Sequence, residues 1–265
     1  MTLTEAVILA IIEGITEFLP VSSTGHMIIA SSLMGIADDA FTKTFTVAIQ
    51  FGTILSVVFL YYKRFLRSID FYKKLLIAFL PAAVLGFLLD DMIDQLLSNI
   101  VVVAVSLVAG GIIFLYIDEW LKGSTAVNDE EISSPRALRI GLFQCIAMIP
   151  GVSRSAATII GGLASGLNRK SAAEFSFFLA VPTMFAATVY KVFKFTRDGS
   201  FNGTEQINLL IIGNVIGFAV ALIAIRSFIG YLSKHGFVIF GWYRIILGVL
   251  ILLLNALGYN LQLTD

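Results

Sequence analysis

The chain is a succession of apolar runs separated by short polar segments. Six of the runs are close to the roughly 20 residues that a helix needs to cross a bilayer, and few charges interrupt them. They cover about residues 44–62, 75–91, 100–117, 172–193, 207–226 and 237–258. We predict that each of the six is a membrane-spanning helix.

Two shorter apolar pieces, with a polar break between them, precede each group of three spans. The first break is Ser22-Ser23-Thr24-Gly25, and the second runs from Pro150 to Thr158. The short pieces cover about 5–19, 27–36, 137–149 and the residues up to Leu167. None of them is long enough to span. Irregular backbone at membrane depth is tolerated where protein buries it or where it lines a wet cavity, so each pair predicts a re-entrant helix–loop–helix.

The order of these pieces occurs twice, which indicates an internal repeat. An offset of 131 residues brings Pro20-Val21-Ser22 near Pro150–Ser153, with one inserted glycine, and places Gly35 on Gly166. Each half has an odd number of spans, so the second half enters the membrane from the opposite face. The two polar breaks can then meet at the same depth.

The expected fold is an all-α polytopic membrane protein with an inverted-topology repeat. Each half consists of one re-entrant helix–loop–helix and three transmembrane helices. We expect a single integral membrane domain over 1–265. Its parts are repeat one at 1–120, a polar linker at 121–135 and repeat two at 136–265.

Composition supports this class of protein. The chain is 58% hydrophobic and 14% charged, whereas soluble domains carry about 25% charged residues. The formal net charge is zero, so no basic field for nucleic acid is expected. Cys145 is the single cysteine, which excludes an intrachain disulfide, and its apolar surroundings favour a packing role. The N-terminus lacks a basic segment, so we expect no cleaved signal peptide.

Basic residues predict the orientation of the spans, because Lys and Arg accumulate in cytoplasmic loops. One side carries Lys63, Arg64, Arg67, Lys73, Lys74, Lys122, Arg136, Arg139, Arg169, Lys170, Arg226 and Lys234. The other side holds mainly Lys43, Lys191, Lys194 and Arg197. Both termini and the 92–99 connection are then expected outside the cell.

The first break and the helix before it bring together carboxylates, hydroxyls and an imidazole. Glu13 and Glu17 are four residues apart and so share one helix face, and His26 follows the break directly. An ionisable side chain at membrane depth costs roughly 2.5–3.5 kcal/mol on insertion scales, so function is the expected reason for the group. The hydroxyls at 22–24 are also compatible with capping the helix that starts near His26.

The two carboxylates have alternative roles. They are hard oxygen ligands of the kind that Mg²⁺ and Ca²⁺ prefer, or one of them acts as a general base. An interfacial position without chemistry is the alternative for Glu13. Gln144 is the repeat counterpart of Glu13 and a candidate polar partner.

The second break adds a fixed positive charge. Arg154 lies between Ser153 and Ser155, with Gly151 before it and Thr158 one turn later. An arginine fork with hydroxyls and backbone N–H groups at a helix N-terminus is typical of a phosphate site. An interfacial anchor is the alternative for this arginine. Phosphoryl transfer on a lipid with a phosphorylated head group fits the whole set best, because that chemistry is mostly positioning and charge neutralisation.

At these residues the sequence resembles the undecaprenyl pyrophosphate phosphatase family, the bacitracin-resistance type of bacterial cell-wall enzyme. The acidic motif E-x-x-x-E matches Glu13 and Glu17 and continues into L-P-V-S-S-T-G-H, which ends at His26. P-G-x-S-R-S-x-x-T matches Pro150 to Thr158, and E-F-S-F-x-L-A-V-P matches Glu174 to Pro182. One departure is Ala156, where a glycine is common.

The resemblance implies hydrolysis of C55 isoprenyl pyrophosphate to the monophosphate carrier lipid and inorganic phosphate, with bacitracin resistance as a consequence. It implies a divalent cation, Mg²⁺ or Ca²⁺, and a site that faces the outer side of the bacterial plasma membrane. We expect Glu17 with Glu13 either to hold this ion or to orient His26. The implied catalytic residues are Glu17, His26, Ser23, Arg154 and Glu13. The candidates for substrate binding are Ser22, Thr24, Gly25, Ser153, Ser155, Thr158 and Gly151. Ser23, His26 and water all remain open as the nucleophile.

Other expected partners are membrane lipids, with a homodimer left open and no nucleic acid. A lipid-phosphate transporter or scramblase with the same embedded site is the alternative function, because inverted repeats with broken helices are also a transporter architecture.

Overall fold

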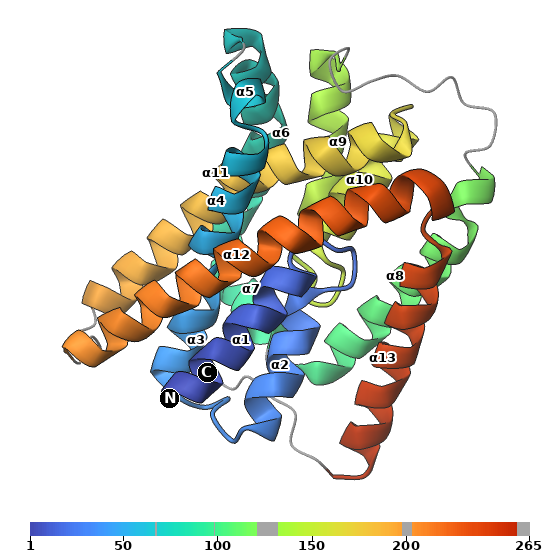
Figure 1. Ribbon diagram of the computed structural model, residues 1–265. Coiled ribbons are helices and arrows are strands. Elements are labelled where there is room, and N and C mark those ends of the chain that lie inside the picture. The colour runs from blue at the N-terminus through green and yellow to red at the C-terminus, as the bar shows by residue number, and fades with distance from the viewer. Residues whose placement is uncertain (67, 98, 121–131, 198–202, 259–265) are drawn as a thin grey trace.

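The structure is a computed structural model that describes residues 1–66, 68–97, 99–120, 132–197 and 203–258 (Figure 1). Within these ranges it is all helical, with no strand. The helices are α1 Leu3–Thr16, α2 Ser23–Leu33, α3 Ala40–Ala48, α4 Gln50–Leu60, α5 Tyr62–Phe65, α6 Ile69–Leu88, α7 Asp90–Leu97, α8 Ile100–Trp120, α9 Ser134–Ile146, α10 Arg154–Ala164, α11 Arg169–Arg197, α12 Thr204–His235 and α13 Val238–Ala256.

Six segments of the described chain are long and apolar enough to cross a membrane, and they correspond to the six predicted runs. They are Ala40–Leu60, which joins α3 and α4, and the single helices α6, α8, α11, α12 and α13. The chain is therefore a multi-pass membrane protein. Helices α11 and α12 extend beyond their predicted runs, because polar end residues such as Lys194 and Arg197 continue the helix without adding hydropathy.

Four shorter helices form two pairs, α1 with α2 and α9 with α10. The start of α2 differs from the sequence prediction. It begins at Ser23 and not near His26, because the Ser22 hydroxyl caps it by accepting the N–H of Gly25. Three residues expected in the polar break thus form the first turn of a helix. The predicted linker at 121–135 lies mostly outside the described residues, and α9 already begins at Ser134, with Pro135 in its first turn.

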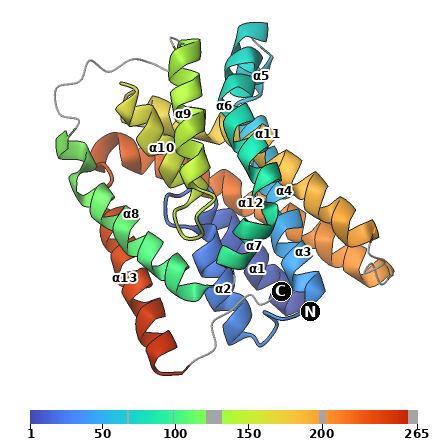
Figure 2. The ribbon, with the colours of Figure 1, turned by 180° about the vertical axis from the view of Figure 1, so that it is seen from behind.

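The short helices pack across the two halves of the chain. Helix α1 lies against α12 of the second half, and α9 lies against α6 of the first half (Figures 1 and 2). Helices α8 and α13 run side by side along one flank. At the α9–α6 contact a Cβ on Gly141 would lie 2.3 Å from the carbonyl oxygen of Ala78, so only glycine permits this approach.

The apolar core holds the turn between α1 and α2 in place. Phe18 of that turn is fully buried and contacts Phe177 of α11 edge to face, with ring centroids 5.3 Å apart. The turn is thereby fixed against the helix that also contacts the second break. Glu17 precedes Phe18 directly and the break begins at Ser22, so the packing of Phe18 fixes the backbone that carries these polar side chains.

Candidate functional site

The two short helix pairs share one unusual backbone feature at their turns. Ser22 has φ 69° and Ser153 has φ 74°, and these are the only non-glycine residues with positive φ in the described chain. Each serine is the N-cap of the following helix, and its hydroxyl accepts the backbone N–H three residues later, at Gly25 and Ala156 respectively. Such conformations are costly and cluster at functional sites. The two turns are therefore built alike around their polar residues.

An ion pair joins the two turns. Nη2 of Arg154, at the start of α10, lies 3.0 Å from Oε1 of Glu17, the C-cap residue of α1. The side chain of Glu17 is 7% exposed and that of Arg154 is 13% exposed. The sequence prediction that the acidic and arginine segments meet holds at these atoms. An ion pair that is largely shielded from water interacts more strongly than one on the surface.

Glu17 also contacts the first turn of α2. The hydroxyl of Ser23 donates to Oε2 of Glu17 at 2.6 Å. One carboxylate thus accepts from a hydroxyl through one oxygen and from a guanidinium through the other. A carboxylate that accepts a serine hydroxyl can take its proton, so the arrangement can activate Ser23 for attack.

A second set of contacts fixes Arg154. Its Nη1 donates to the carbonyl oxygen of Ser176 at 2.9 Å. The hydroxyls of Ser176 and Thr158 lie 2.6 Å apart, and Thr158 also donates to the carbonyl of Arg154. The Phe18 ring centroid lies 5.7 Å from the guanidinium carbon. These contacts, with those to Glu17 and Met184, occupy Nη1 and Nη2 and leave the buried Nε as the guanidinium nitrogen without a partner.

His26 is directed away from Glu17. Its Nδ1 lies 2.7 Å from the carbonyl oxygen of Ser22, and its Nε2 lies 2.6 Å from the hydroxyl of Tyr243 on α13. A carbonyl oxygen only accepts, so Nδ1 carries the proton and Nε2 accepts from Tyr243. Burial lowers the pKa of His26, which favours this neutral form. The structure therefore brings Glu17 to Ser23 and not to His26.

Glu13 is the most deeply buried acid of the group, with 1% of its surface exposed. Its Oε1 has no hydrogen-bond partner, while Gln50 donates to the carboxylate. Burial, reinforced by the charge of Glu17, raises the pKa of the Glu13 carboxyl well above its usual range. A free carboxylate oxygen beside a second acid suits a divalent cation, because Mg²⁺ commonly binds one or two carboxylates and completes its shell with water and phosphate. No cluster of three His, Cys, Asp or Glu residues occurs in the described chain.

The candidates for substrate binding fall into two groups. Ser23, Thr24, Ser153 and Arg154 are partly exposed and can contact a ligand. The others are buried and support the turns: Ser22, Gly25, Gly151, Ser155 and Thr158. Among these, the hydroxyl of Ser155 donates to the carbonyl of Leu19 at 2.9 Å and so links the two turns directly.

Three contact residues were missed from the sequence: Ser176, Tyr243 and Arg244. Arg244 is fully buried, and it donates to the carbonyl oxygens of Pro20 and Gly151, one in each turn. A charged residue in the middle of the apolar run 237–258 is an indication of function that the sequence does contain. Ser176 lies within the matched motif Glu174 to Pro182 but was given no role. Tyr243 carries no comparable indication, because a lone hydroxyl in a span is common.

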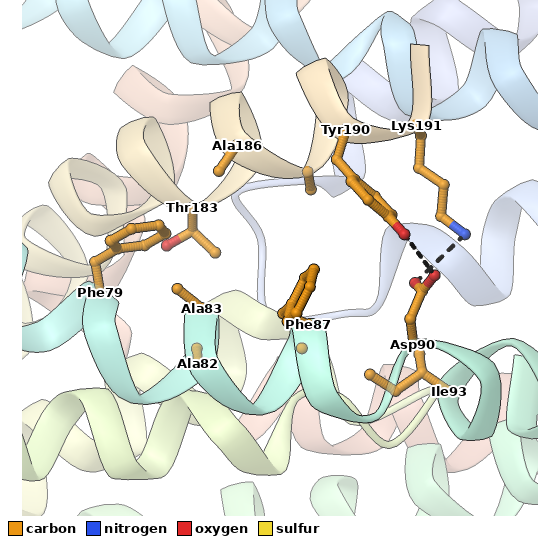
Figure 3. Close-up of a pocket in the computed structure, with 12 residues that line it drawn as sticks. Phe79, Ala82, Ala83, Phe87, Asp90, Ile93, Thr183, Ala186, Tyr190 and Lys191 are labelled. Carbon is orange, nitrogen blue, oxygen red and sulfur yellow. Dashed lines mark hydrogen bonds and ion pairs between the residues drawn. The ribbon is translucent and has the colours of Figure 1, made fainter. Parts of the chain in front are cut away.

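A cavity of about 340 Å³ is lined by residues of α6, α7 and α11 (Figure 3). Apolar and small side chains line most of it, and Asp90, Tyr190 and Lys191 meet at one end. At the other end Thr183 donates to Gln144, the counterpart of Glu13. The next residue of α11, Met184, contacts Arg154 through its sulfur at 3.4 Å. The ion pair of Arg154 with Glu17 therefore lies outside the cavity.

Comparisons with known proteins all lead to one family of membrane enzymes. A family model described as bacitracin resistance protein BacA matches residues 6–250. The chain is 59% identical over 263 residues to a protein of Flavobacterium psychrophilum named undecaprenyl-diphosphatase, covering 99% of this chain and 100% of that protein. Proteins of the same name from Flavobacterium johnsoniae and Bdellovibrio bacteriovorus are 60% and 54% identical, over 96% and 99% of this chain and 97% and 100% of theirs.

Proposed function

The chain belongs to the bacitracin resistance protein BacA family, and we propose that the ion pair between its two turns is the centre of its chemistry. The chain is an undecaprenyl-diphosphatase, a membrane hydrolase that recycles the lipid carrier of cell-wall synthesis. The lipid transporter considered from the sequence is not what the relatives are named for. The observation that carries the proposal is the contact of Glu17 with both Ser23 and Arg154.

In the proposed mechanism, Ser23 is the nucleophile. Glu17 accepts the hydroxyl proton while the oxygen of Ser23 attacks the terminal phosphorus of the diphosphate. The bond from that phosphorus to the bridging oxygen breaks, and the lipid monophosphate leaves. Water then attacks the phosphoserine, releasing inorganic phosphate and returning the proton to the serine oxygen. Ser23 is preferred over His26 as the nucleophile, because the unprotonated nitrogen of His26, Nε2, accepts a hydrogen bond from Tyr243.

Arg154 stabilises the phosphate charge in this mechanism. Its fork matches phosphate oxygens, and the partly exposed Ser153 lies beside it. The first turns of α2 and α10 begin at Ser23 and Arg154, so both helices bring free backbone N–H groups to the same place. Positioned donors of this kind supply much of the rate enhancement in phosphoryl transfer.

We propose that a divalent cation, Mg²⁺ or Ca²⁺, is held by Glu13 and Glu17. The unpartnered Oε1 of Glu13 and its buried position beside a second acid support this assignment. The ion would neutralise phosphate charge when bound. Glu13 would keep Glu17 oriented and would share the charge of the acidic pair.

We further propose the inverted repeat, with re-entrant pairs α1–α2 and α9–α10 and a site that opens to the outer face of the plasma membrane. The crosswise packing of α1 on α12 and of α9 on α6 supports the repeat, since each is the other's counterpart under an exchange of halves. The distribution of basic residues supports the orientation of the spans, whereas the outward-facing site is what the family resemblance implies. Substituted-cysteine labelling from either side of intact cells, in a Cys145→Ser background, tests the orientation.

The experiment that tests the mechanism is phosphate release from C55 isoprenyl diphosphate by purified protein in detergent. Ser23→Ala is expected to lose activity by roughly three orders of magnitude or more. The matched control is Ser32→Ala, on the same helix as Ser23. The hydroxyl of Ser32 is buried and has no hydrogen-bond partner, so this variant should remain active. A quenched reaction with labelled substrate should trap phosphate on Ser23. Near-normal turnover by Ser23→Ala would exclude Ser23 as the nucleophile, and labelled phosphate on His26 would identify His26 as the nucleophile.

A further inference from the structure

Arg244 of α13 is a buried cation whose hydrogen bonds in the described chain all go to carbonyl oxygens. It is 0% exposed, and no carboxylate of the described chain lies within ion-pair distance. Its Nη1 donates to Pro20 at 3.1 Å and its Nη2 to Gly151 at 3.1 Å. Nη2 also donates to Ser106, and Nε to Leu107. A buried charge of this kind is expensive, and in membrane proteins such residues are functional by default.

The two turn carbonyls that Arg244 binds are equivalent positions. At the offset of 131 that places Ser22 on Ser153, Pro20 corresponds to Gly151. One planar guanidinium therefore donates to matching atoms of both turns, two residues before each capping serine. Because its fork is rigid, it fixes the separation of those two oxygens. Lysine has a single point of charge and cannot reproduce this geometry.

The surroundings leave room for the guanidinium and for nothing else. A Cβ on Gly110 of α8 would lie 2.3 Å from Nη2, and a Cβ on Gly151 would lie 2.2 Å from the carbonyl oxygen of Val103. Gly151 also has φ 89°, which favours glycine. The centroid of the Phe114 ring lies 5.8 Å from the guanidinium carbon. Helices α8 and α13 thus enclose the arginine against the turns.

We propose that Arg244 is a positioning residue for phosphate transfer: it fixes the second turn against the first, so that Arg154 and Ser23 meet at Glu17. The inference rests on the mechanism proposed above. Arg244 has no access to substrate, and it acts only through the backbone of the turns. Its neighbour Tyr243 binds His26, so one turn of α13 contacts both the imidazole and the backbone of the site.

The test compares Arg244→Met, Arg244→Lys and Gly110→Ala in detergent, with C55 isoprenyl diphosphate as the substrate. Misplacing reacting groups by about 1 Å costs roughly 100-fold, so we expect kcat to fall about 100-fold in Arg244→Met and roughly 10-fold in the other two variants. KM should change less than about threefold, because Arg154 still binds the diphosphate. Gly230→Ala on α12, where no atom lies within 4 Å of the added methyl group, is the matched control and should behave as wild type.

Rates are measured well below the unfolding midpoint and divided by the folded fraction, so that lost stability alone does not lower kcat. Partial rescue by lysine together with the split between kcat and KM supports positioning. Unchanged kcat in folded Arg244→Met or Gly110→Ala overturns the proposal, as does failure of all three variants to fold. If wild type releases no phosphate, the proposed function fails instead. If wild type is active and Ser23→Ala is too, only the assignment of Ser23 fails.

Discussion

The two turns of the site share a backbone and differ in charge. Both end in a serine with positive φ that caps the next helix. The first residue of that helix is Ser23 in one turn and Arg154 in the other. The first turn has Glu13 and His26 nearby, where the offset of 131 gives Gln144 and Ala157 in the second.

If the two turns are copies of one element, as proposed above, the difference indicates how duplication can make a site that neither copy contains. In the proposed mechanism the first turn supplies the proton acceptor and the hydroxyl, and the second supplies the cation. The shared backbone sets where the side chains start, and the ion pair of Arg154 with Glu17 joins the two chemistries. The comparison predicts that removing the charge from either turn disables the shared site, whereas removing the cap from either turn costs a similar amount of stability.

The largest effect is expected from removing either charge of the pair. Arg154→Ala and Glu17→Ala should each lower kcat by roughly 10³–10⁵-fold, the range seen when an arginine that neutralises a transferred phosphoryl group is lost. Phosphate release in detergent measures this. Arg139→Ala, at an exposed arginine of α9, is the control. A loss confined to one of the two variants would break the view that the turns act as one site.

The capping serines should respond in parallel. Ser22→Ala and Ser153→Ala each remove a cap and are expected to cost about 0.5–2 kcal/mol of stability. Ser22→Gly and Ser153→Gly lose the same cap but relieve the positive φ, so their cost should be a few tenths of a kcal/mol. Denaturation in detergent measures all four. A cost that appears at one turn only would show that the turns are not equivalent.

The smallest effect is expected from Glu13, the buried acid of the first half that the offset of 131 places on Gln144. A carboxyl whose folded pKa is raised contributes stability at low pH, and this contribution is lost as the pH rises above the ordinary value near 4.3. With chelator present, the unfolding temperature of wild type should therefore fall with rising pH relative to Glu13→Gln. Glu205→Gln, at an exposed site, is the control and should follow wild type. Added Mg²⁺ should reduce the difference, and parallel curves for Glu13→Gln and wild type would contradict the assignment.

Much of the fold and part of the site follow from local sequence patterns. Apolar length is enough to predict the six spans. The motifs and the resemblance named Glu17, Ser23 and Arg154, which the structure brings into contact. The start of α2 was predicted near His26 and lies at Ser23, because the Ser22 cap begins the helix before the apolar run starts. Tyr243 and Arg244 were missed because their partners are distant in sequence, 93 or more residues away. Ser176 was missed because its contacts with Arg154 and Thr158 depend on how α10 packs against α11.

A double-mutant cycle on Glu17 and Arg154 tests the central claim most directly. Phosphate release is measured for Glu17→Gln, Arg154→Met and the double variant, all confirmed as folded. If one shared site joins the two turns, the double variant should be only a few-fold slower than the slower single variant, because the second change removes a group that has already lost its partner. Losses that multiply would mean that Glu17 and Arg154 act independently, and would contradict the account.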